Sequence, residues 1–201
     1  PRSTLFPYTT LFRSDRAYAI GAEEEKMSQL ESDLKTTIRD IPDFPKEGIL
    51  FKDITPVLAD PGLMGAITDA FAEHFHERGV EVIVGMESRG FLFGVPLALA
   101  MGVPFAPARK PGKLPYESIG VEYELEYGTN RLEMHVDAVT EGAGVLMVDD
   151  LLATGGTAAA TCQLVRELGG RVVGCAFVIE LGFLEGRSAL GDVEVQSLVI
   201  Y

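Results

Sequence analysis

A buried strand that runs into two acidic residues and a glycine-rich turn constrains this chain more than any other feature. Residues 145–148 are apolar, Asp149 and Asp150 follow them, and residues 154–157 read Thr-Gly-Gly-Thr before a helical pattern begins. Glycines let backbone N–H groups approach an oxyanion closely, and the free N–H groups at a helix start attract it. Two adjacent carboxylates beside such a turn suit a neutral diol, such as the hydroxyls of a ribose, better than a second phosphate. The pattern therefore predicts a site for a phosphorylated sugar.

The alternative is a tight turn with helix-capping residues, which would need neither the second acid nor both glycines. The spacing also differs from that of a P-loop, which requires a lysine after its last glycine.

Short apolar strands alternate with helices along the rest of the chain. We predict strands at residues 81–85, 103–108, 145–148 and 172–179. We predict helices at residues 28–39, 61–78, 91–101 and 157–168. This alternation predicts an α/β fold, an open and mainly parallel twisted sheet with helices on both faces.

An insertion separates the second predicted strand from the third. Residues 109–115 are basic and rich in turn formers, and residues 122–136 alternate apolar with polar side chains around a predicted turn at residues 128–130. The apolar positions are Tyr123, Leu125, Tyr127, Leu132, Met134 and Val136. This pattern predicts a β-hairpin with one apolar face, preceded by a mobile basic loop. A long insertion of this kind in a compact α/β domain is typical of an active-site lid.

Residues 1–26 differ in pattern from the rest of the chain. The chain opens with Pro1, and residues 3–14 mix Thr, Phe, Tyr and Arg without a helical or strand period. Met27 precedes a capping-box pattern and apolar residues at helical spacing. We interpret Met27 as the natural start, residues 1–26 as added sequence or a disordered tail, and residues 27–201 as one domain.

Composition excludes several kinds of partner. The chain has 30 acidic and 17 basic residues and a net charge of −13, so it would repel nucleic-acid backbones. Its 2 cysteines lack CxxC spacing, which favours a reduced, cytoplasmic protein. Prolines and glycines interrupt the uncharged residues 91–108, which indicates a buried helix and strand rather than a membrane span.

Residues 149–157, Asp-Asp-Leu-Leu-Ala-Thr-Gly-Gly-Thr, resemble the phosphoribosyl-pyrophosphate signature of the type I phosphoribosyltransferases. Residues 44–56, 87–91, 109–115 and 125–128 further resemble the adenine-specific group of that family. The resemblance covers residues 27–201. It implies the type I phosphoribosyltransferase fold with a hairpin lid and a small N-terminal hood. It also implies a homodimeric purine-salvage enzyme that converts adenine and phosphoribosyl pyrophosphate into AMP and pyrophosphate.

The resemblance implies roles for particular residues on the sugar side. Asp149 and Asp150 would contact the ribose hydroxyls. The 5′-phosphate would bind the turn residues Ala153, Thr154, Gly155, Gly156 and Thr157. The pyrophosphate would bind Ser88 and Arg89, joined on lid closure by Arg109, Lys110 and Lys113. A solvated turn is the alternative for Arg109 and Lys110.

Further roles are implied for the base and the chemistry. Phe51 and Leu181 would sandwich the purine, while Leu50 and Lys52 would offer backbone groups to its edge. Glu126 would be the catalytic acid, with Tyr127 beside it and Arg89 assisting. A solvent-facing hairpin acid is the alternative for Glu126, because Glu122 and Glu124 share its face.

Breaking the bond from C1′ to pyrophosphate leaves an oxocarbenium-like sugar and a polyanionic leaving group. Mg²⁺ and fixed cations must neutralise that charge, and exclusion of water prevents hydrolysis. The resemblance implies Mg²⁺ bound through the substrate, or through water to Asp149 and Asp150, with no direct side-chain ligand.

Two other functions remain open at this point. One is a phosphoribosyltransferase for 6-oxopurines, whose related enzymes carry an Asp at the turn position that is Ala153 here. The other is a noncatalytic regulator that senses phosphoribosyl pyrophosphate on the same fold, although no added nucleic-acid-binding domain is visible in the sequence.

Overall fold

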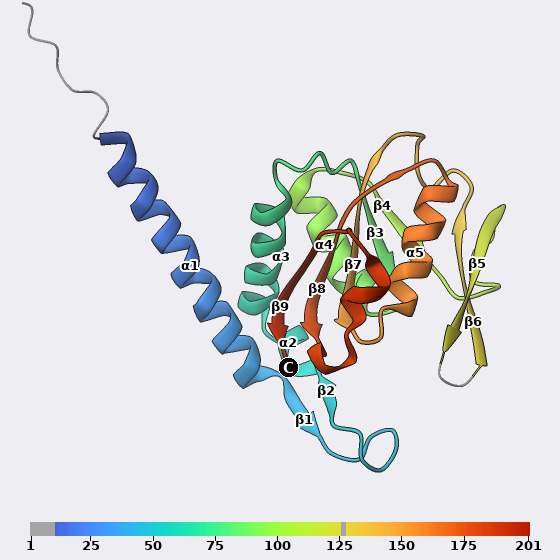
Figure 1. Cartoon of the computed structure of the whole chain (residues 1–201), viewed down its shortest axis with the longest axis horizontal. Coiled ribbons are helices and arrows are strands. Elements are labelled where there is room, and N and C mark those ends of the chain that lie inside the picture. The colour runs from blue at the N-terminus through green and yellow to red at the C-terminus, as the bar shows by residue number, and fades with distance from the viewer. Residues whose placement is uncertain (1–10, 126–127) are drawn as a thin grey trace, which may run out of the picture.

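The computed structural model describes residues 11–125 and 128–201, with a five-stranded sheet at its centre (Figure 1). The strands lie in the order β4-β3-β7-β8-β9, and every neighbouring pair is parallel. Their bounds are β3 (Val82–Met86), β4 (Phe105–Ala108), β7 (Gly144–Leu152), β8 (Arg171–Glu180) and β9 (Val195–Ile200). The predicted open parallel sheet is confirmed, and β9 is a strand that the sequence patterns did not reveal.

Helices cover both faces of this sheet, as predicted. Helix α3 (Pro61–Phe75) and helix α4 (Gly90–Met101) pack on one face, and α5 (Gly156–Glu167) packs on the other (Figure 1). The side chain of Asp60 caps α3 by accepting hydrogen bonds from the N–H groups of Gly62 and Leu63. The uncharged stretch at residues 91–108 divides between α4 and β4. Among the described residues, no helix is both long enough and apolar enough to cross a membrane.

Alternation along β7 builds a core on each side of the sheet. Leu146 and Val148 join the α3–α4 core, whereas Val145 and Met147 join the α5 core. All four side chains are fully buried. A strand buried on both faces is nearly continuous in apolar residues, which is why it was visible in the sequence.

The predicted hairpin consists of β5 (Ser118–Leu125) and β6 (Gly128–His135), and its base packs on α5. Val121, Leu132 and Met134 are buried there, which confirms one apolar face at the base. The predicted turn at residues 128–130 is wrong, because these residues already belong to β6 and pair with residues 123–125. The pairing register that buries the apolar face prevails over the turn propensity of Gly and Asn. Val136 lies beyond β6 and is 40% exposed.

The first helix is longer than predicted. Helix α1 (Leu11–Thr37) runs through Met27 without a break and projects away from the sheet (Figure 1). Leu30 and Leu34 are buried in the α3–α4 core, as their spacing predicted. Residues 11–26, which form the first part of α1, are rich in the good helix formers Ala and Glu although they lack an apolar period.

A small unit follows α1 in the chain and lies at the carboxyl edge of the sheet. Strands β1 (Arg39–Ile41) and β2 (Phe51–Asp53) pair antiparallel, and α2 (Thr55–Leu58) leads on to α3. The loop between β1 and β2 extends beyond the ends of β7 and β8 (Figure 1). This unit is the hood that the family resemblance implied.

Candidate active site

The strand order determines where a ligand can bind. Strand β3 lies between β4 and β7, so the order of strands along the chain reverses at β3. In open α/β sheets, ligands bind outside the carboxyl ends of the strands at such a point. The loop after β3 carries Ser88 and Arg89, and the turn after β7 leads into α5. Two segments that are far apart in the sequence therefore meet here.

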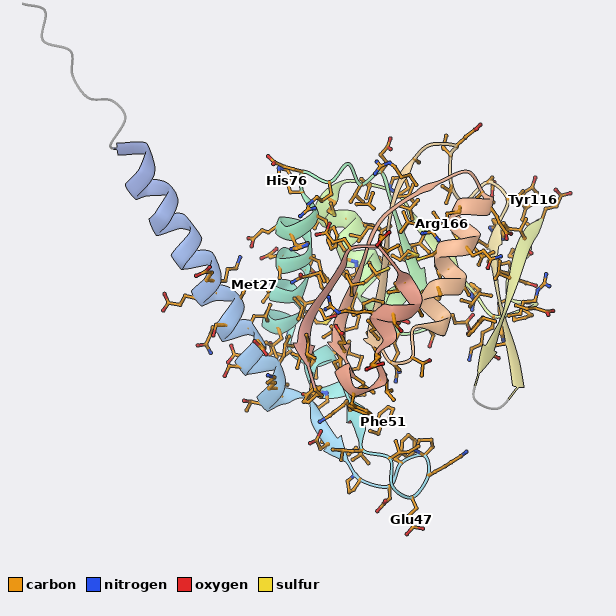
Figure 2. The ribbon with its side chains drawn as sticks, in the orientation of Figure 1. Met27, Glu47, Phe51, His76, Tyr116 and Arg166 are labelled. Carbon is orange, nitrogen blue, oxygen red and sulfur yellow. The ribbon has the colours of Figure 1, made fainter. Side chains whose placement is uncertain are left out.

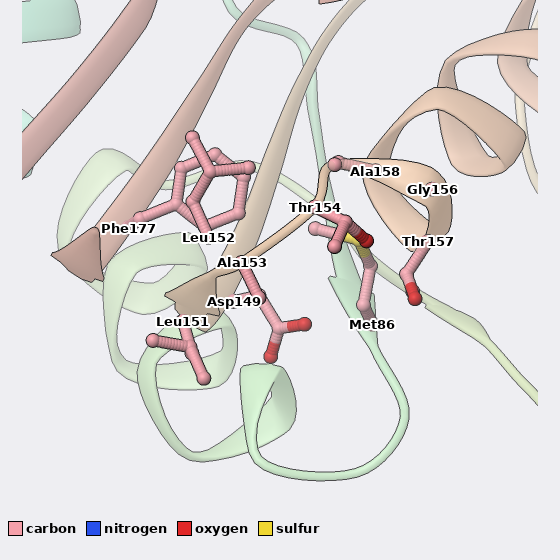
Figure 3. Close-up of a pocket in the computed structure, with 11 residues that line it drawn as sticks. Met86, Asp149, Leu151, Leu152, Ala153, Thr154, Gly156, Thr157, Ala158 and Phe177 are labelled. Carbon is pink, nitrogen blue, oxygen red and sulfur yellow. The ribbon is translucent and has the colours of Figure 1, made fainter. Parts of the chain in front are cut away.

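The turn after β7 encloses a small hollow, which Figure 3 shows with its lining side chains. Gly155 has a φ of +83°, in the left-handed region, and a Cβ atom there would overlap the carbonyl oxygen of Gly186. Only glycine satisfies both demands. Helix α5 starts at Gly156, so its free N–H groups face the hollow. Thr154 and Thr157 add hydroxyl groups to the lining.

Asp149 and Asp150 lie at the end of β7, within the strand rather than after it. Asp150 is 5% exposed, and its carboxylate forms an ion pair with Arg89, whose Nε lies 2.7 Å away. The backbone N–H of Asp150 donates to a carboxylate oxygen of Asp149 at 2.9 Å. Desolvation, and next the negative charge of Asp150, raise the pKa of Asp149 well above 3.8. Neutral hydroxyl donors or a cation would relieve the cost of ionising Asp149.

A second hollow opens directly from the first. The two share Asp149, Leu151, Ala153 and Thr157 in their linings, so they adjoin one another at the end of β7. The cations of the second hollow are Arg89 and Lys110. A neutral diol near Asp149 and a polyanion near these cations would fit side by side. The remaining lining residues are Glu87, Ser88, Tyr123, Asn130, Leu132 and Asp150.

Glu87 organises the basic loop after β4. One of its carboxylate oxygens accepts from Nε of Arg109 at 3.3 Å and from the backbone N–H of Lys110 at 2.8 Å. Desolvation alone would raise the pKa of Glu87, but these two donors outweigh it and lower the pKa below 4.5. Arg109 also donates to the carbonyl oxygen of Lys113 and exchanges two backbone hydrogen bonds with Glu133 of β6. The basic loop is thus tied to its own hairpin at this point.

Of the predicted basic residues, the structure places Lys110 in the pocket lining and leaves Arg109 and Lys113 beside it. Glu126 and Tyr127 lie outside the described residues. Tyr123 lies on β5, and its hydroxyl is 3.2 Å from Oγ1 of Thr157. This contact joins the hairpin to the start of α5.

The predicted base-binding residues come from two elements at the same edge. Phe51 lies on β2, between the loop that carries Glu47 and the sheet (Figure 2), and its ring centroid is 5.8 Å from the guanidinium of Arg89. Leu181 comes directly after β8, where its N–H donates to the carbonyl oxygen of Leu152 at 2.9 Å. Leu50 is 51% exposed. The two predicted walls of a base site thus flank the end of β7 and the Arg89 loop.

The side chain of Lys52 is engaged elsewhere. Its ammonium donates to Asp40 at 2.6 Å and lies 3.6 Å above the ring centroid of Tyr201. The side chain of Lys52 is thus held within the protein, and the role of its backbone groups at the base edge stays a prediction.

Sequence reasoning missed several residues that line the pocket or pack against its turn. Glu87 was visible only as the residue before Ser88, and Tyr123 only as part of an apolar face. Gly186 gave no signal at all, because its contact with Gly155 joins segments that are distant in the chain. The Glu87–Ser88 peptide bond is cis, another feature without a sequence signature.

The acidic side chains of the pocket are the candidate ligands for Mg²⁺. Within residues 11–125 and 128–201, no three His, Cys, Asp or Glu side chains converge as a metal site. Asp150 is partnered by Arg89, whereas Asp149 accepts from a neutral backbone donor. One or two carboxylates together with substrate phosphates are what Mg²⁺ commonly uses in proteins. The residues fit an ion that is shared with a phosphorylated substrate.

The phosphoribosyl transferase domain model matches residues 53–199, which span the sheet and the whole pocket. The chain belongs to the phosphoribosyl transferase family.

Its relatives narrow the class further. An adenine phosphoribosyltransferase of Myxococcus xanthus is 55% identical over 172 residues, which cover 86% of this chain and 94% of the relative. One from Acaryochloris marina is 56% identical over 169 residues, covering 84% and 99%. A crystal structure of the Thermoanaerobacter pseudethanolicus enzyme superposes with a TM-score of 0.82 at 52% identity, covering 85% of this chain and 99% of that one. Within the family, the chain groups with the adenine phosphoribosyltransferases.

Proposed function

We propose that this chain transfers the phosphoribosyl group of phosphoribosyl pyrophosphate to adenine, forming AMP and pyrophosphate in purine salvage. The observation that carries the proposal is the pair of adjoining hollows that brings together the turn after β7, Asp149 and Arg89. The yeast relative, 46% identical with a TM-score of 0.81, was crystallised with adenine. The Trypanosoma brucei relative, 26% identical, was crystallised with AMP, pyrophosphate and ribose-5-phosphate.

The pocket suggests a place for each part of the sugar substrate. The hollow at Ala153, Thr154, Gly155, Gly156 and Thr157 would hold the 5′-phosphate on the α5 N–H groups and the threonine hydroxyls. Asp149 and Asp150 would accept hydrogen bonds from the ribose hydroxyls.

The pyrophosphate would occupy the second hollow. Ser88, Arg89 and Lys110 line that hollow. Arg109 and Lys113 would join them when the hairpin closes. Fixed cations around the leaving group stabilise the charge that develops as the bond to C1′ breaks.

Mg²⁺ is the proposed cofactor, shared between the substrate and the acids at the end of β7. When bound, it supplies positive charge to the pyrophosphate oxygens. Asp149 and Asp150 would hold it directly or through water, in keeping with their oxygen ligands and their place between the two hollows.

The base would stack between Phe51 and Leu181, with the backbone of Leu50 and Lys52 along its edge. The fixed side chain of Lys52 supports this assignment, because the ion pair with Asp40 holds the backbone beside it. Ala153 supplies no acid from the turn, so the proton on the base must be handled elsewhere. We assign that role to Glu126, with Tyr127 beside it.

A second copy of the chain is the proposed partner. The outer face of α4 exposes Leu92, Val95 and Leu99, which are 43%, 42% and 78% exposed. Their spacing places them along one side of the helix, and an apolar stripe of this kind suits a homodimer interface. Both cysteines, Cys162 and Cys175, are buried free thiols, which suits the reducing cytoplasm.

Pyrophosphate release tests the proposal. The protein should release pyrophosphate when adenine, phosphoribosyl pyrophosphate and Mg²⁺ are all present, and omission of adenine should abolish release. A noncatalytic sensor would bind phosphoribosyl pyrophosphate without releasing pyrophosphate under any of these conditions. A 6-oxopurine enzyme would release it with hypoxanthine or guanine instead.

A further inference from the structure

The segment between β8 and β9 touches the proposed active site at two points. At its start, Leu181 donates its N–H to Leu152 at the end of β7. Farther along, two short 3₁₀ turns, η1 (Gly182–Leu184) and η2 (Gly186–Leu190), bring Gly186 against the turn that precedes α5. One segment therefore borders both the proposed base site and the proposed phosphate site.

The contact at Gly186 is backbone against backbone. A Cβ atom on Gly186 would overlap the carbonyl oxygen of Ala153. A Cβ atom on Gly155 would overlap the carbonyl oxygen of Gly186 and come within 2.9 Å of Cβ of Ala189. The two backbones are thus packed too closely for a side chain between them, and packed interiors transmit small shifts. The position of η2 therefore sets the position of the phosphate turn.

An ion pair between the buried Glu180 and the half-exposed Arg187 holds η2 in place. Nε of Arg187 donates a hydrogen bond of 2.7 Å to Oε1 of Glu180, and Nη2 donates one of 2.7 Å to Oε2. The hydroxyl of Ser197 on β9 donates to the same carboxylate at 2.6 Å, and Nη1 of Arg187 reaches the carbonyl oxygen of Val195 at 3.2 Å. Glu180 is 5% exposed. Bidentate pairing of this kind fixes geometry as well as adding energy.

Glu180 is also the residue that precedes Leu181. The pair thus joins the two ends of the segment, with Leu181 at one end and Gly186 at the other. Hydrogen bonds from Arg187 are the main reason that the pKa of Glu180 is lowered, with Ser197 adding to them and burial opposing them. The carboxylate is accordingly held in its charged, paired form at neutral pH.

We propose that Glu180 and Arg187 are positioning residues, which hold the segment of residues 181–187 so that the phosphate turn and Leu181 keep their geometry. Neither side chain lines the pocket, so both act through Gly186 and Leu181 rather than on the substrate. The inference rests on the proposed function, because it assigns the turn to the 5′-phosphate and Leu181 to the base.

Arg187→Met tests the inference, because it keeps the length of the side chain and removes the paired donors. Arg78→Met is the matched control. Arg78 donates a 2.7 Å bond to Glu194, just before β9, and so lies at the amino edge of the sheet, away from the pocket. Arg187→Lys keeps the charge, and Ser197→Ala removes one hydrogen bond as a milder change.

The readouts are kcat, the KM values for phosphoribosyl pyrophosphate and adenine, the Kd for AMP by equilibrium titration, and Tm. We expect Arg187→Met to raise the KM for phosphoribosyl pyrophosphate and the Kd for AMP by about tenfold or more. Arg187→Lys should recover most of that loss, and Ser197→Ala should show a smaller change in the same direction. Arg78→Met should lower Tm while leaving KM and Kd within about twofold of wild type.

Unchanged KM and Kd in folded Arg187→Met protein would overturn the inference and leave a purely structural ion pair. If Arg187→Met fails to fold, unchanged values in both Arg187→Lys and Ser197→Ala would do the same. Failure of the proposed function looks different, because wild-type protein would then neither release pyrophosphate nor bind AMP. That result would remove the basis of the inference as well.

Discussion

Nε of Arg89 lies 2.7 Å from a carboxylate oxygen of Asp150, so these two residues are paired within the pocket. The neighbouring Asp149 instead accepts from a neutral donor, the backbone N–H of Asp150. Adjacent acids at the end of one strand are thus unequal, because one has a cation at hydrogen-bond distance and the other does not. This inequality leads to different expectations for the two.

Both acids should matter for catalysis. Asp149→Asn and Asp150→Asn keep the shape of the side chain and remove its charge, and a charge-assisted hydrogen bond is worth about 1.5–3 kcal/mol. We expect kcat/KM to fall roughly tenfold to a hundredfold in each variant. Steady-state kinetics on adenine and phosphoribosyl pyrophosphate measure the effect. Wild-type kinetics in both variants would contradict the ribose assignment.

The melting temperatures of Asp149→Asn and Asp150→Asn should differ in direction from that of the wild type. The pKa of Asp149 is raised in the folded protein, so the folded state keeps a proton that the unfolded chain releases above about pH 3.8. Ionisation of Asp149 therefore destabilises the fold as pH rises through this window, and Asp149→Asn escapes the effect. We expect Asp149→Asn to raise Tm near neutral pH by about 2–4 °C, the shift that about 1 kcal/mol gives in a chain of this size.

Thermal unfolding at about pH 5 and about pH 8 checks the sign, because the advantage of Asp149→Asn should be larger at the higher pH. Asp150→Asn is the control, since it removes the partner of Arg89 and should lower Tm. An Asp149→Asn protein that is less stable than wild type at both pH values would contradict the account of the raised pKa.

The glycine at the turn should be irreplaceable. Gly155→Ala forces a side chain into left-handed backbone and against the carbonyl oxygen of Gly186, so we expect a loss of about 1–3 kcal/mol and weaker phosphate binding. Chemical denaturation and AMP titration measure the two effects.

Gly65→Ala is the control for this glycine substitution. Gly65 lies within α3, where an added Cβ meets nothing within 4 Å, so this change should be neutral or stabilising by up to about 1 kcal/mol. Equal effects of the two substitutions would show that the turn has no special demand for glycine.

Fold and site differ in how far the sequence predicts them. The strand at Val145, Leu146, Met147 and Val148 depends on a local pattern and was predicted correctly. The hairpin turn was placed wrongly at Gly128, because local turn propensity competes with a register that burial of Leu132 decides. Tertiary packing overrides local sequence preferences of this kind wherever the two conflict.

The pocket shows the same division. Asp149 and the turn at Gly155 are visible in the sequence because they form one continuous motif. The contacts of Glu87 with Arg109 and of Gly155 with Gly186 join segments that the chain separates widely, and no periodicity encodes them. Such contacts depend on the order of strands in the sheet, which local patterns do not specify.

Residues 1–26 should be dispensable for activity and stability. We propose that residues 27–201 form the functional domain, and deletion of residues 1–26 should leave kcat/KM unchanged and Tm within about 2 °C of wild type. One contact between residues 1–26 and the domain is an exposed 2.7 Å ion pair between Lys26 and Glu73, which is worth about 0–1 kcal/mol. Lys26→Ala in the full chain controls for that pair. A fall in Tm of several degrees beyond the control would show that α1 needs its first half.

The choice of base tests the central claim most directly. The measurement is kcat/KM for adenine and for hypoxanthine with saturating phosphoribosyl pyrophosphate and Mg²⁺, followed as AMP or IMP formed. A base edge that is read by backbone hydrogen-bonding groups discriminates by about 10⁴ or more, because a mismatched edge leaves polar groups unpaired. We predict turnover with adenine and almost none with hypoxanthine. Comparable kcat/KM values for the two bases would contradict the account.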